Sequence, residues 1–159
     1  MMKTIQLLII IVAVVTFWGC EEEITVTRAT YSQIFTGETS KTWRMTAIQI
    51  LEDGRPTGSF PTPDDCAFDD VFVFYNNPEK LFIVDNNTKK CNEDEPQELV
   101  RDTWSFVNAS ATIEMVVPIL ADFKLPFIVK SIDESDMTTE IFFEGGSYRF
   151  IYEVVSIGD

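Results

Sequence analysis

Apolar and polar residues alternate in short runs through most of the chain after Gly37. In the last of these runs, Tyr148 and Phe150 are separated by Arg149, and the alternation continues to residue 155. Such a pattern is typical of a β-strand with one buried face, because successive side chains point to opposite sides of a sheet. The pattern predicts eight strands, at residues 42–51, 68–75, 81–85, 99–107, 111–116, 123–132, 137–143 and 147–155.

Two irregularities are expected within these strands. In strand 42–51 the apolar positions change phase after Ala47, to Ile48 and Ile50, which indicates a β-bulge or a sharp bend. Pro126 has no N–H to donate to a ladder, so strand 123–132 is expected to lie at an edge, a bulge or a seam there. Residues 52–63 hold three prolines and two glycines and predict an irregular loop.

The connections after residue 68 are mostly short, which favours a meander of consecutive antiparallel strands. Eight such strands can close into an up-and-down barrel without exposed edges, and a two-sheet sandwich is the competing arrangement. Residues 31–35, followed by Gly37, predict a short helical turn that would cover one end of the barrel. We therefore expect an all-β fold, an eight-stranded antiparallel barrel with a short N-terminal helical turn.

The predicted strands are dense in aromatic residues, with 13 phenylalanines, 4 tyrosines and 3 tryptophans in the whole chain. A barrel of eight strands either fills its interior with side chains or encloses one small ligand. The aromatic residues therefore have two interpretations, a packed core or the lining of a cavity for a small apolar molecule. The candidate lining residues are Phe72, Phe74, Trp104, Phe106, Phe127, Phe150 and Tyr152.

The first 19 residues have the parts of an export signal: Lys3, an apolar run over residues 5–15, and Gly19 before Cys20. The apolar run is shorter than the roughly 20 residues that span a bilayer, and an uncleaved anchor helix is the alternative. The Gly19-Cys20 junction resembles a bacterial lipobox, which implies that Cys20 carries the acyl chains of a membrane anchor. The expected divisions are a lipoprotein signal peptide (1–19), a tether with the helical turn (20–36) and a barrel (37–159).

Three acidic residues, Glu21 to Glu23, follow Cys20 directly. Acidic residues at this place resemble a surface-export signal of lipoproteins in the phylum Bacteroidetes. That resemblance implies a protein anchored by lipid to the outer membrane, on its periplasmic or cell-surface face. A solvated spacer is the alternative interpretation.

Two cysteines, Cys66 and Cys91, remain once Cys20 is assigned to the lipid anchor. In an exported domain, a single remaining pair suggests one disulfide bond. Free buried thiols or thiolate metal ligands are the alternatives, although two thiols without any histidine make a poor zinc site.

The charge of the chain restricts its function further. It has 26 acidic and 12 basic side chains; without Lys3 of the leader, 11 basic side chains remain, and the net charge is −15. Such a charge repels nucleic acids and anionic membrane surfaces. The chain has no histidine, and no catalytic residues, cofactor or metal site are predicted. Acidic residues beside both cysteines leave a calcium site as a minor alternative to a solvated acidic surface.

Three short motifs and Cys91 resemble the lipocalin-like lipoproteins of Bacteroidetes; the motifs are SKTWR (40–44), DCAFDD (65–70) and DTWSF (102–106). The resemblance extends over residues 37–157 by the order of the elements and implies a divergent lipocalin-type barrel. It also implies that Trp43 packs at the barrel end under Arg149 in a cation–π contact. The family has a glycine two residues before this tryptophan, where the present chain has Lys41.

These observations together predict a lipid-anchored, non-enzymatic protein of the cell envelope. It would bind a small apolar ligand or serve a structural role. The alternative is a protein-interaction subunit of an outer-membrane complex, which would require an exposed apolar surface. The segments most suited to such a surface are residues 60–63 and 119–125.

Overall fold

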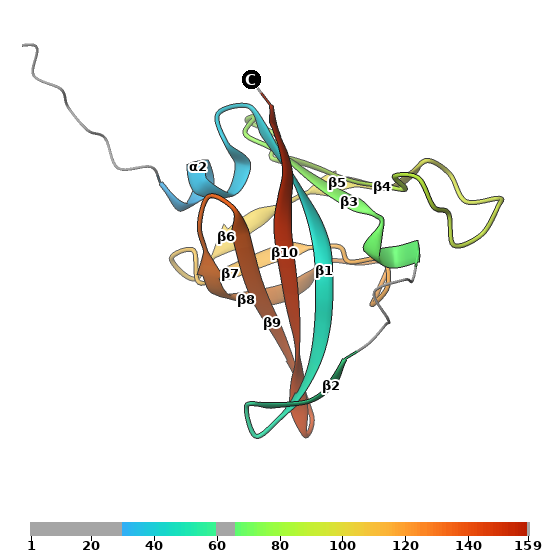
Figure 1. The fold of residues 1–159 in the computed structure, drawn as a ribbon. Helices are drawn as coiled ribbons and strands as arrows, with labels where there is room; N and C mark the ends of the chain where they lie inside the picture. The colour runs from blue at the N-terminus through green and yellow to red at the C-terminus, as the bar shows by residue number, and fades with distance from the viewer. Residues whose placement is uncertain (1–29, 60–65, 159) are drawn as a thin grey trace, which may run out of the picture.

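The computed structural model describes residues 30–59 and 66–158, which form an antiparallel β-barrel with one short helix at its end (Figure 1). The helix is α2 (Tyr31–Thr36), and a single turn of 3-10 helix is η1 (Cys66–Phe68). The strands are β1 (Ser40–Glu52), β2 (Arg55–Ser59), β3 (Val71–Tyr75), β4 (Leu81–Asp85), β5 (Glu98–Thr103), β6 (Ser105–Val107), β7 (Thr112–Met115), β8 (Leu125–Ile132), β9 (Asp136–Phe143) and β10 (Gly146–Gly158).

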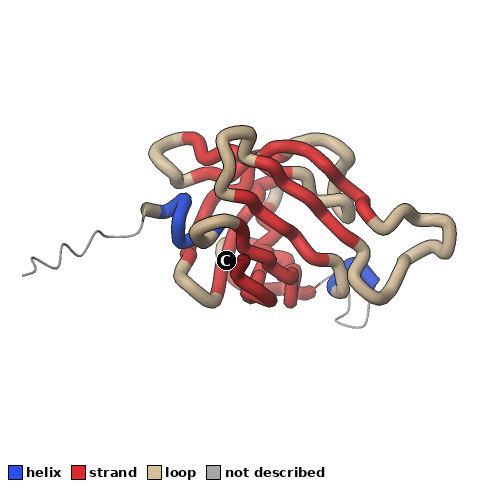
Figure 2. Tube along the Cα trace, turned by 90° about the horizontal axis from the view of Figure 1, so that it is seen from above, coloured by secondary structure: helices blue, strands red, loops and turns tan. Residues whose placement is uncertain are grey.

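Nine strands follow one another around the barrel in the order β5-β4-β3-β1-β10-β9-β8-β7-β6, and β2 pairs with β1 outside this path. The first and last strands of the chain are therefore neighbours in the wall. At one end of the barrel lie α2 and the end of β10, and at the other end β2 and the β9–β10 hairpin extend beyond the wall (Figure 1). Seen from above, the β4–β5 loop reaches far out to one side (Figure 2). The predicted all-β antiparallel barrel is confirmed.

The strand count differs from the prediction at two places. Residues 99–107, predicted as one strand, form β5 and β6, which are separated at Trp104. The side chain of Trp104 is buried, and its ring N–H donates to the carbonyl of Tyr75 at 3.2 Å. This anchoring turns the chain at Trp104, so that β5 pairs with β4 and β6 pairs with β7. The predicted loop 52–63 also contains the short strand β2, in which Pro56 pairs opposite Leu51.

Both expected irregularities are present. The ladder between β1 and β10 shifts register between Met45 and Ala47, where the apolar pattern changes phase. Pro126 pairs with Glu114 of β7 and has no ladder partner in β9, because the pairing of β8 with β9 begins only at Ile128. The missing N–H of Pro126 is thus placed where β8 has a neighbour on one side only.

Helix α2 covers one end of the barrel and is held there by its sequence. Thr30 and Gln33 form a capping box at its start, and Gly37 ends it with φ 67°, a conformation that favours glycine. Phe35 is fully buried, with its ring centroid 4.3 Å from that of Phe74. The indole N–H of Trp43 donates to the carbonyl of Phe35 at 2.9 Å, which joins the helix to β1.

The predicted disulfide between Cys66 and Cys91 is present and joins η1 to the β4–β5 loop, with 5.2 Å between the Cα atoms. The two cysteines are 25 residues apart. Closing a loop of that size stabilises the fold by about 3.5 kcal/mol in the chain-entropy account. The bond ties the middle of the long polar β4–β5 loop to η1.

Several predictions concern residues outside the described ranges: the signal peptide, the lipidation of Cys20, the acidic residues 21–23 and the apolar segment 60–63. Within residues 30–59 and 66–158, no helix has the length and apolar character needed to cross a membrane.

Candidate binding site at the barrel seam

The aromatic residues predicted to line a cavity pack against one another in the barrel interior. All seven are buried except Phe106, which is partly buried against the same cluster. The ring centroids of Phe74 and Phe82 are 4.6 Å apart, and those of Phe127 and Phe150 are 5.3 Å apart. Such spacings are those of direct aromatic contact, so these side chains pack against one another as core residues do.

Trp43 also packs at the barrel end, but its cationic neighbour is Lys41 and not Arg149. The Lys41 ammonium lies 5.2 Å from the centre of the Trp43 ring. Arg149 instead lies 3.4 Å from Glu140 and pairs opposite Gln49, six positions along β1 from Trp43. The expected partner is therefore corrected: Lys41, two residues before Trp43 in β1, supplies the cation.

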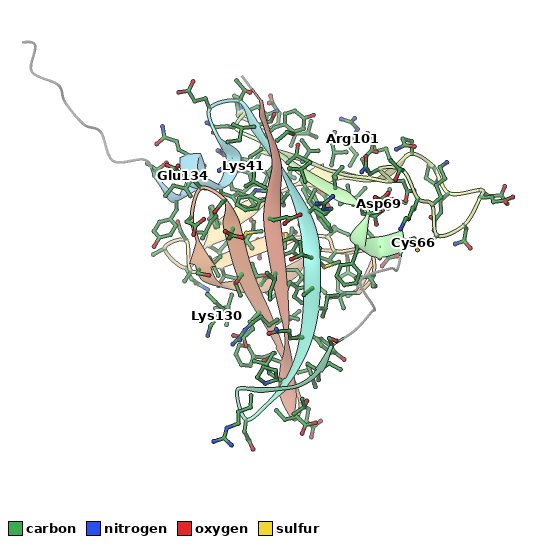
Figure 3. The ribbon with its side chains drawn as sticks, in the orientation of Figure 1. Lys41, Cys66, Asp69, Arg101, Lys130 and Glu134 are labelled. Carbon is green, nitrogen blue, oxygen red and sulfur yellow. A yellow bond between two sulfur atoms is a disulfide. The ribbon has the colours of Figure 1, made fainter. Side chains whose placement is uncertain are left out.

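Lys41 is almost fully buried and connects helix α2 to the β8–β9 turn at the covered end of the barrel. Figure 3 shows Lys41 close to Glu134 of that turn. Its ammonium donates to the carbonyl of Ile34 in α2 and to the carbonyl of Glu134 in the β8–β9 turn. Desolvation lowers the pKa of Lys41, and the nearby charges of Glu134 and Asp133 oppose this change. Lys41 thus holds the helix against the barrel wall, a structural role that the sequence pattern did not reveal.

Two acidic residues near the disulfide, Asp69 and Glu95, accept hydrogen bonds from the β4–β5 loop. Asp69, which lies close to Cys66 in Figure 3, accepts hydrogen bonds from the backbone of Thr88 and Lys89 at 2.6 and 2.7 Å. Desolvation opposes ionisation of Asp69, but these bonds outweigh it and lower its pKa. Glu95 accepts the N–H of Cys91 at 2.9 Å. Within the described ranges, no three His, Cys, Asp or Glu side chains gather as a metal site would require.

The barrel wall is incomplete on one side, where the strand order begins at β5 and ends at β6. β6 pairs with β7 at three positions, but β5 pairs only with β4 among the described strands. Beside β5 runs the segment of residues 116–124, which connects β7 to β8 and has no strand assignment. We call the junction between β5 and residues 116–124 the seam.

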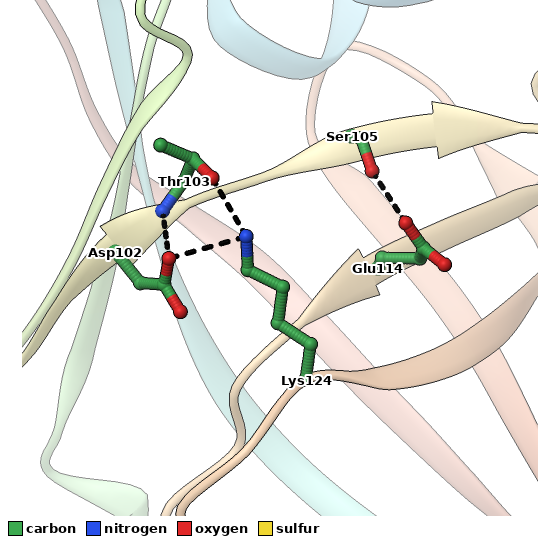
Figure 4. Close-up of polar contacts among 5 residues, drawn as sticks. All are labelled: Asp102, Thr103, Ser105, Glu114 and Lys124. Carbon is green, nitrogen blue, oxygen red and sulfur yellow. Dashed lines mark hydrogen bonds and ion pairs between the residues drawn. The ribbon is translucent and has the colours of Figure 1, made fainter.

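Side chains bridge the seam where the backbone ladder is missing. The Lys124 ammonium lies 3.1 Å from a carboxylate oxygen of Asp102 and donates to the hydroxyl of Thr103 at 2.6 Å (Figure 4). Desolvation opposes ionisation of Asp102, but the bonds from Thr103 and Lys124 outweigh it and lower its pKa. Further along, the Ser105 hydroxyl donates to Glu114 at 2.7 Å across the short β6–β7 ladder. These contacts close one end of the seam.

A groove of about 330 Å³ follows the seam beyond the Lys124 bridge. Successive residues of a strand point to opposite faces, so a groove in contact with four consecutive residues of β5 must run along the edge of that strand. Residues of the 116–124 segment form the opposite wall. The lining residues are Leu99, Val100, Arg101, Asp102, Val116, Pro118, Ala121 and Asp122.

The rim of the groove carries charge and one exposed ring. Arg101 is bound to Glu98 through two hydrogen bonds of 2.9 and 2.6 Å, which neutralises both. Asp122 makes no ion pair with any residue in the described ranges. The next residue, Phe123, is 62% exposed, whereas other apolar residues of the predicted interaction segment 119–125 pack against the core. The groove is therefore acidic at Asp122, and an exposed aromatic residue follows Asp122 in the chain.

Two other surface hollows have similar volumes, about 290 Å³ beside Arg44 and about 370 Å³ beside Tyr31. In the first, Arg44 and Glu153 form an ion pair with each other. The second lies against β8 and the β6–β7 turn. Neither hollow is lined by β5, whose edge away from β4 has no ladder partner in the described ranges. The seam groove is therefore the better candidate for binding another chain.

The sequence pattern singled out the segment 119–125 and the motif 102–106, but it did not predict that they lie next to each other in the fold. Asp102 and Lys124 are 22 positions apart, and only the turn at Trp104 places β5 opposite the segment after β7. A scan of the chain against protein-family models and a search among curated proteins each give no match, so the site is described by its geometry alone.

Proposed function

We propose that this protein is a non-enzymatic binding module of the cell envelope, anchored to the outer membrane by lipid on Cys20, which binds a protein partner at the seam. The proposal rests on one contrast: aromatic side chains pack together inside the barrel, whereas one edge of β5 has no strand partner in the described ranges. Phe127 and Phe150 lie in direct contact inside the barrel, while the edge of β5 adjoins a groove. Binding is therefore expected on the outer surface of the barrel.

The location is supported by the chemistry of the cysteines. A disulfide between Cys66 and Cys91 is typical of an oxidising compartment, and the leader before Cys20 has the form of an export signal. The net charge of −15 that remains without the leader disfavours adsorption of the domain on anionic lipid. A lipid tether is then the means by which such an acidic domain stays near a membrane.

The anchor is tested with a Cys20→Ser variant of the full chain. We expect this variant to leave the membrane fraction and remain folded with its disulfide intact, because the bridge does not need the Cys20 thiol. Fractionation, followed by mass measurement of the non-reduced protein, gives the result. A variant that stays in the membrane fraction would rule out the lipid anchor.

The binding surface is tested by photo-crosslinking in cells. A photoreactive amino acid replaces Phe123 at the seam or, as the control, Val155, which is 48% exposed on β10 and lies away from the seam. We expect one adduct of defined mass from the Phe123 position and none from the Val155 position. Equal labelling from both positions, or no adduct at the seam, would contradict the proposal.

A further inference from the structure

The backbone of β5 offers hydrogen-bonding groups along the groove. Trp104 donates its N–H to the carbonyl of Lys80, and the ladder places these two residues opposite each other. In an antiparallel pair, hydrogen-bonded positions alternate with positions that face away. Counting back from Trp104, the N–H and C=O groups of Asp102 and Val100 face β4, and those of Arg101 face the groove.

The residues on either side of Arg101 along this edge are less well placed. The N–H of Thr103 is bound to the side chain of Asp102 at 2.6 Å, and Leu99 lies at a register shift, where the regular alternation of the β4–β5 ladder is interrupted. Arg101 is thus the residue whose backbone groups are best placed to pair with another chain. No backbone hydrogen bond joins residues 99–103 to the 116–124 segment in the described ranges.

We propose that the seam groove binds an extended segment of a partner protein, which adds to the free edge of β5 as a further strand; this inference rests on the proposed function. Strand addition to an exposed edge derives its affinity from backbone hydrogen bonds and its specificity from alternate side chains. The four groove residues of β5 span about 13 Å, which sets the length of the segment that lies in the groove, and the backbone of that segment pairs with Arg101.

The lining of the groove defines the chemistry of this segment. Val116 and Val100 provide an apolar wall on the barrel side, so an apolar side chain is expected to point there. The charges of Arg101 and Lys124 are neutralised by Glu98 and Asp102, and Asp122 is left as the excess charge. A lysine or arginine near Asp122, adjoining apolar residues, is therefore expected in the partner segment.

The edge is tested with two substitutions at Arg101. Arg101→Pro removes the N–H that faces the groove and places a proline ring there, while the groups that bind β4 remain. Arg101→Ala removes the same side chain and its contact with Glu98 but keeps the N–H. The two variants differ in the backbone donor and the proline ring, so Arg101→Ala is the matched control.

The probe is a displayed library of short random linear peptides, selected on the disulfide-bonded wild-type barrel. We expect the selected peptides to alternate apolar and basic residues and to bind Arg101→Ala nearly as well as the wild type. Binding to Arg101→Pro is expected to weaken at least about tenfold. Asp122→Asn is expected to weaken binding less and to reduce its salt dependence.

A second measurement keeps the test independent of how well the proline variant folds. In the wild type, the selected peptide should slow hydrogen exchange of the Arg101 amide and leave the exchange of β10 amides unchanged. An empty selection, or peptides that bind Arg101→Pro as tightly as the wild type, would overturn strand addition. Crosslinking from the Phe123 position would still stand in that case, so failure of this inference is distinguishable from failure of the proposed function.

Discussion

The barrel is closed in two very different ways on its two sides. Between β1 and β10 the ladder runs from Ser40 opposite Gly158 to Leu51 opposite Ser147, with only two shifts of register. At the seam, three residue pairs join β6 to β7, and beyond them β5 pairs with β4 alone among the strands of the described ranges. One junction is continuous backbone pairing, whereas the other is completed by the side chain of Lys124.

This difference separates stability from binding. Backbone groups in the β1–β10 junction are paired with each other and unavailable to another molecule, and the adjoining core contains Trp43 and Tyr152. At the seam, backbone groups of β5 face a groove, and the bridge across it is an exposed ion pair. Exposed ion pairs contribute about 1 kcal/mol or less, so the bridge between Lys124 and Asp102 can break at low cost without unfolding the barrel.

The largest expected effect is that of removing the ring that anchors the closed side. Trp43→Ala deletes a fully buried side chain and its bond to Phe35, and we expect a loss of about 3–5 kcal/mol in the free energy of unfolding. Phe123→Ala, at the exposed seam, is the control and should change stability by about 0.5 kcal/mol or less. Chemical denaturation measures both; similar losses for the two variants would remove the distinction between the sides.

A smaller loss is expected at Lys41, which the barrel end buries. Lys41→Met leaves the carbonyls of Ile34 and Glu134 without their donor, which should cost about 1–3 kcal/mol. The control is Lys80→Met, because the ammonium of Lys80 also lies over a tryptophan, 4.9 Å from the ring centre of Trp104. Thermal unfolding of both variants tests the assignment; a greater loss for Lys80→Met would show that the ring contact dominates.

The bridge across the seam should affect local opening more than global stability. Lys124→Ala is expected to cost about 1 kcal/mol or less in unfolding while it speeds hydrogen exchange in residues 116–124. Lys130→Ala, which removes an equally long ion pair to Glu140 at 3.1 Å, is the control away from the seam. If the two variants change exchange at the seam equally, Lys124 does not hold it closed.

The smallest effect concerns pH. The folded-state pKa of Asp102 is lowered below the model-compound value of 3.8, so its contribution to stability is present above pH 3.8 and is lost as pH falls through the lowered pKa. An NMR titration of its carboxyl carbon should give a midpoint below 3.8 that rises in Lys124→Ala. A midpoint at or above 3.8 in the wild type would show that desolvation prevails over the bonds from Thr103 and Lys124.

Local patterns predicted the parts of this architecture that depend on neighbouring residues. Alternation located most strands, the phase change after Ala47 marked a bulge, and Pro126 marked the place where β8 has one neighbour. The cysteine count predicted the bridge between Cys66 and Cys91. Each of these signals acts within one strand or follows from the residue type alone.

Features that depend on distant contacts were not predictable in the same way. Thr103 to Phe106 alternate between polar and apolar residues across the division at Trp104, so that division follows only from the bond of Trp104 to Tyr75 in another strand. A lysine in the first strand gives no sign that it will be buried; Lys41 can be accommodated because carbonyls of Ile34 and Glu134 converge on it. The groove, likewise, exists only once β5 lies beside the chain that follows β7.

Residue-resolved hydrogen exchange of the free protein tests the contrast between the two sides most directly. Tyr152 has ladder partners in both β1 and β9, so its amide should exchange only when the whole barrel unfolds. The amide of Arg101 faces the groove and should exchange faster by orders of magnitude under the same conditions. Protection of the Arg101 amide as strong as that of Tyr152 would mean that the edge of β5 is already paired, and it would contradict the account of the seam.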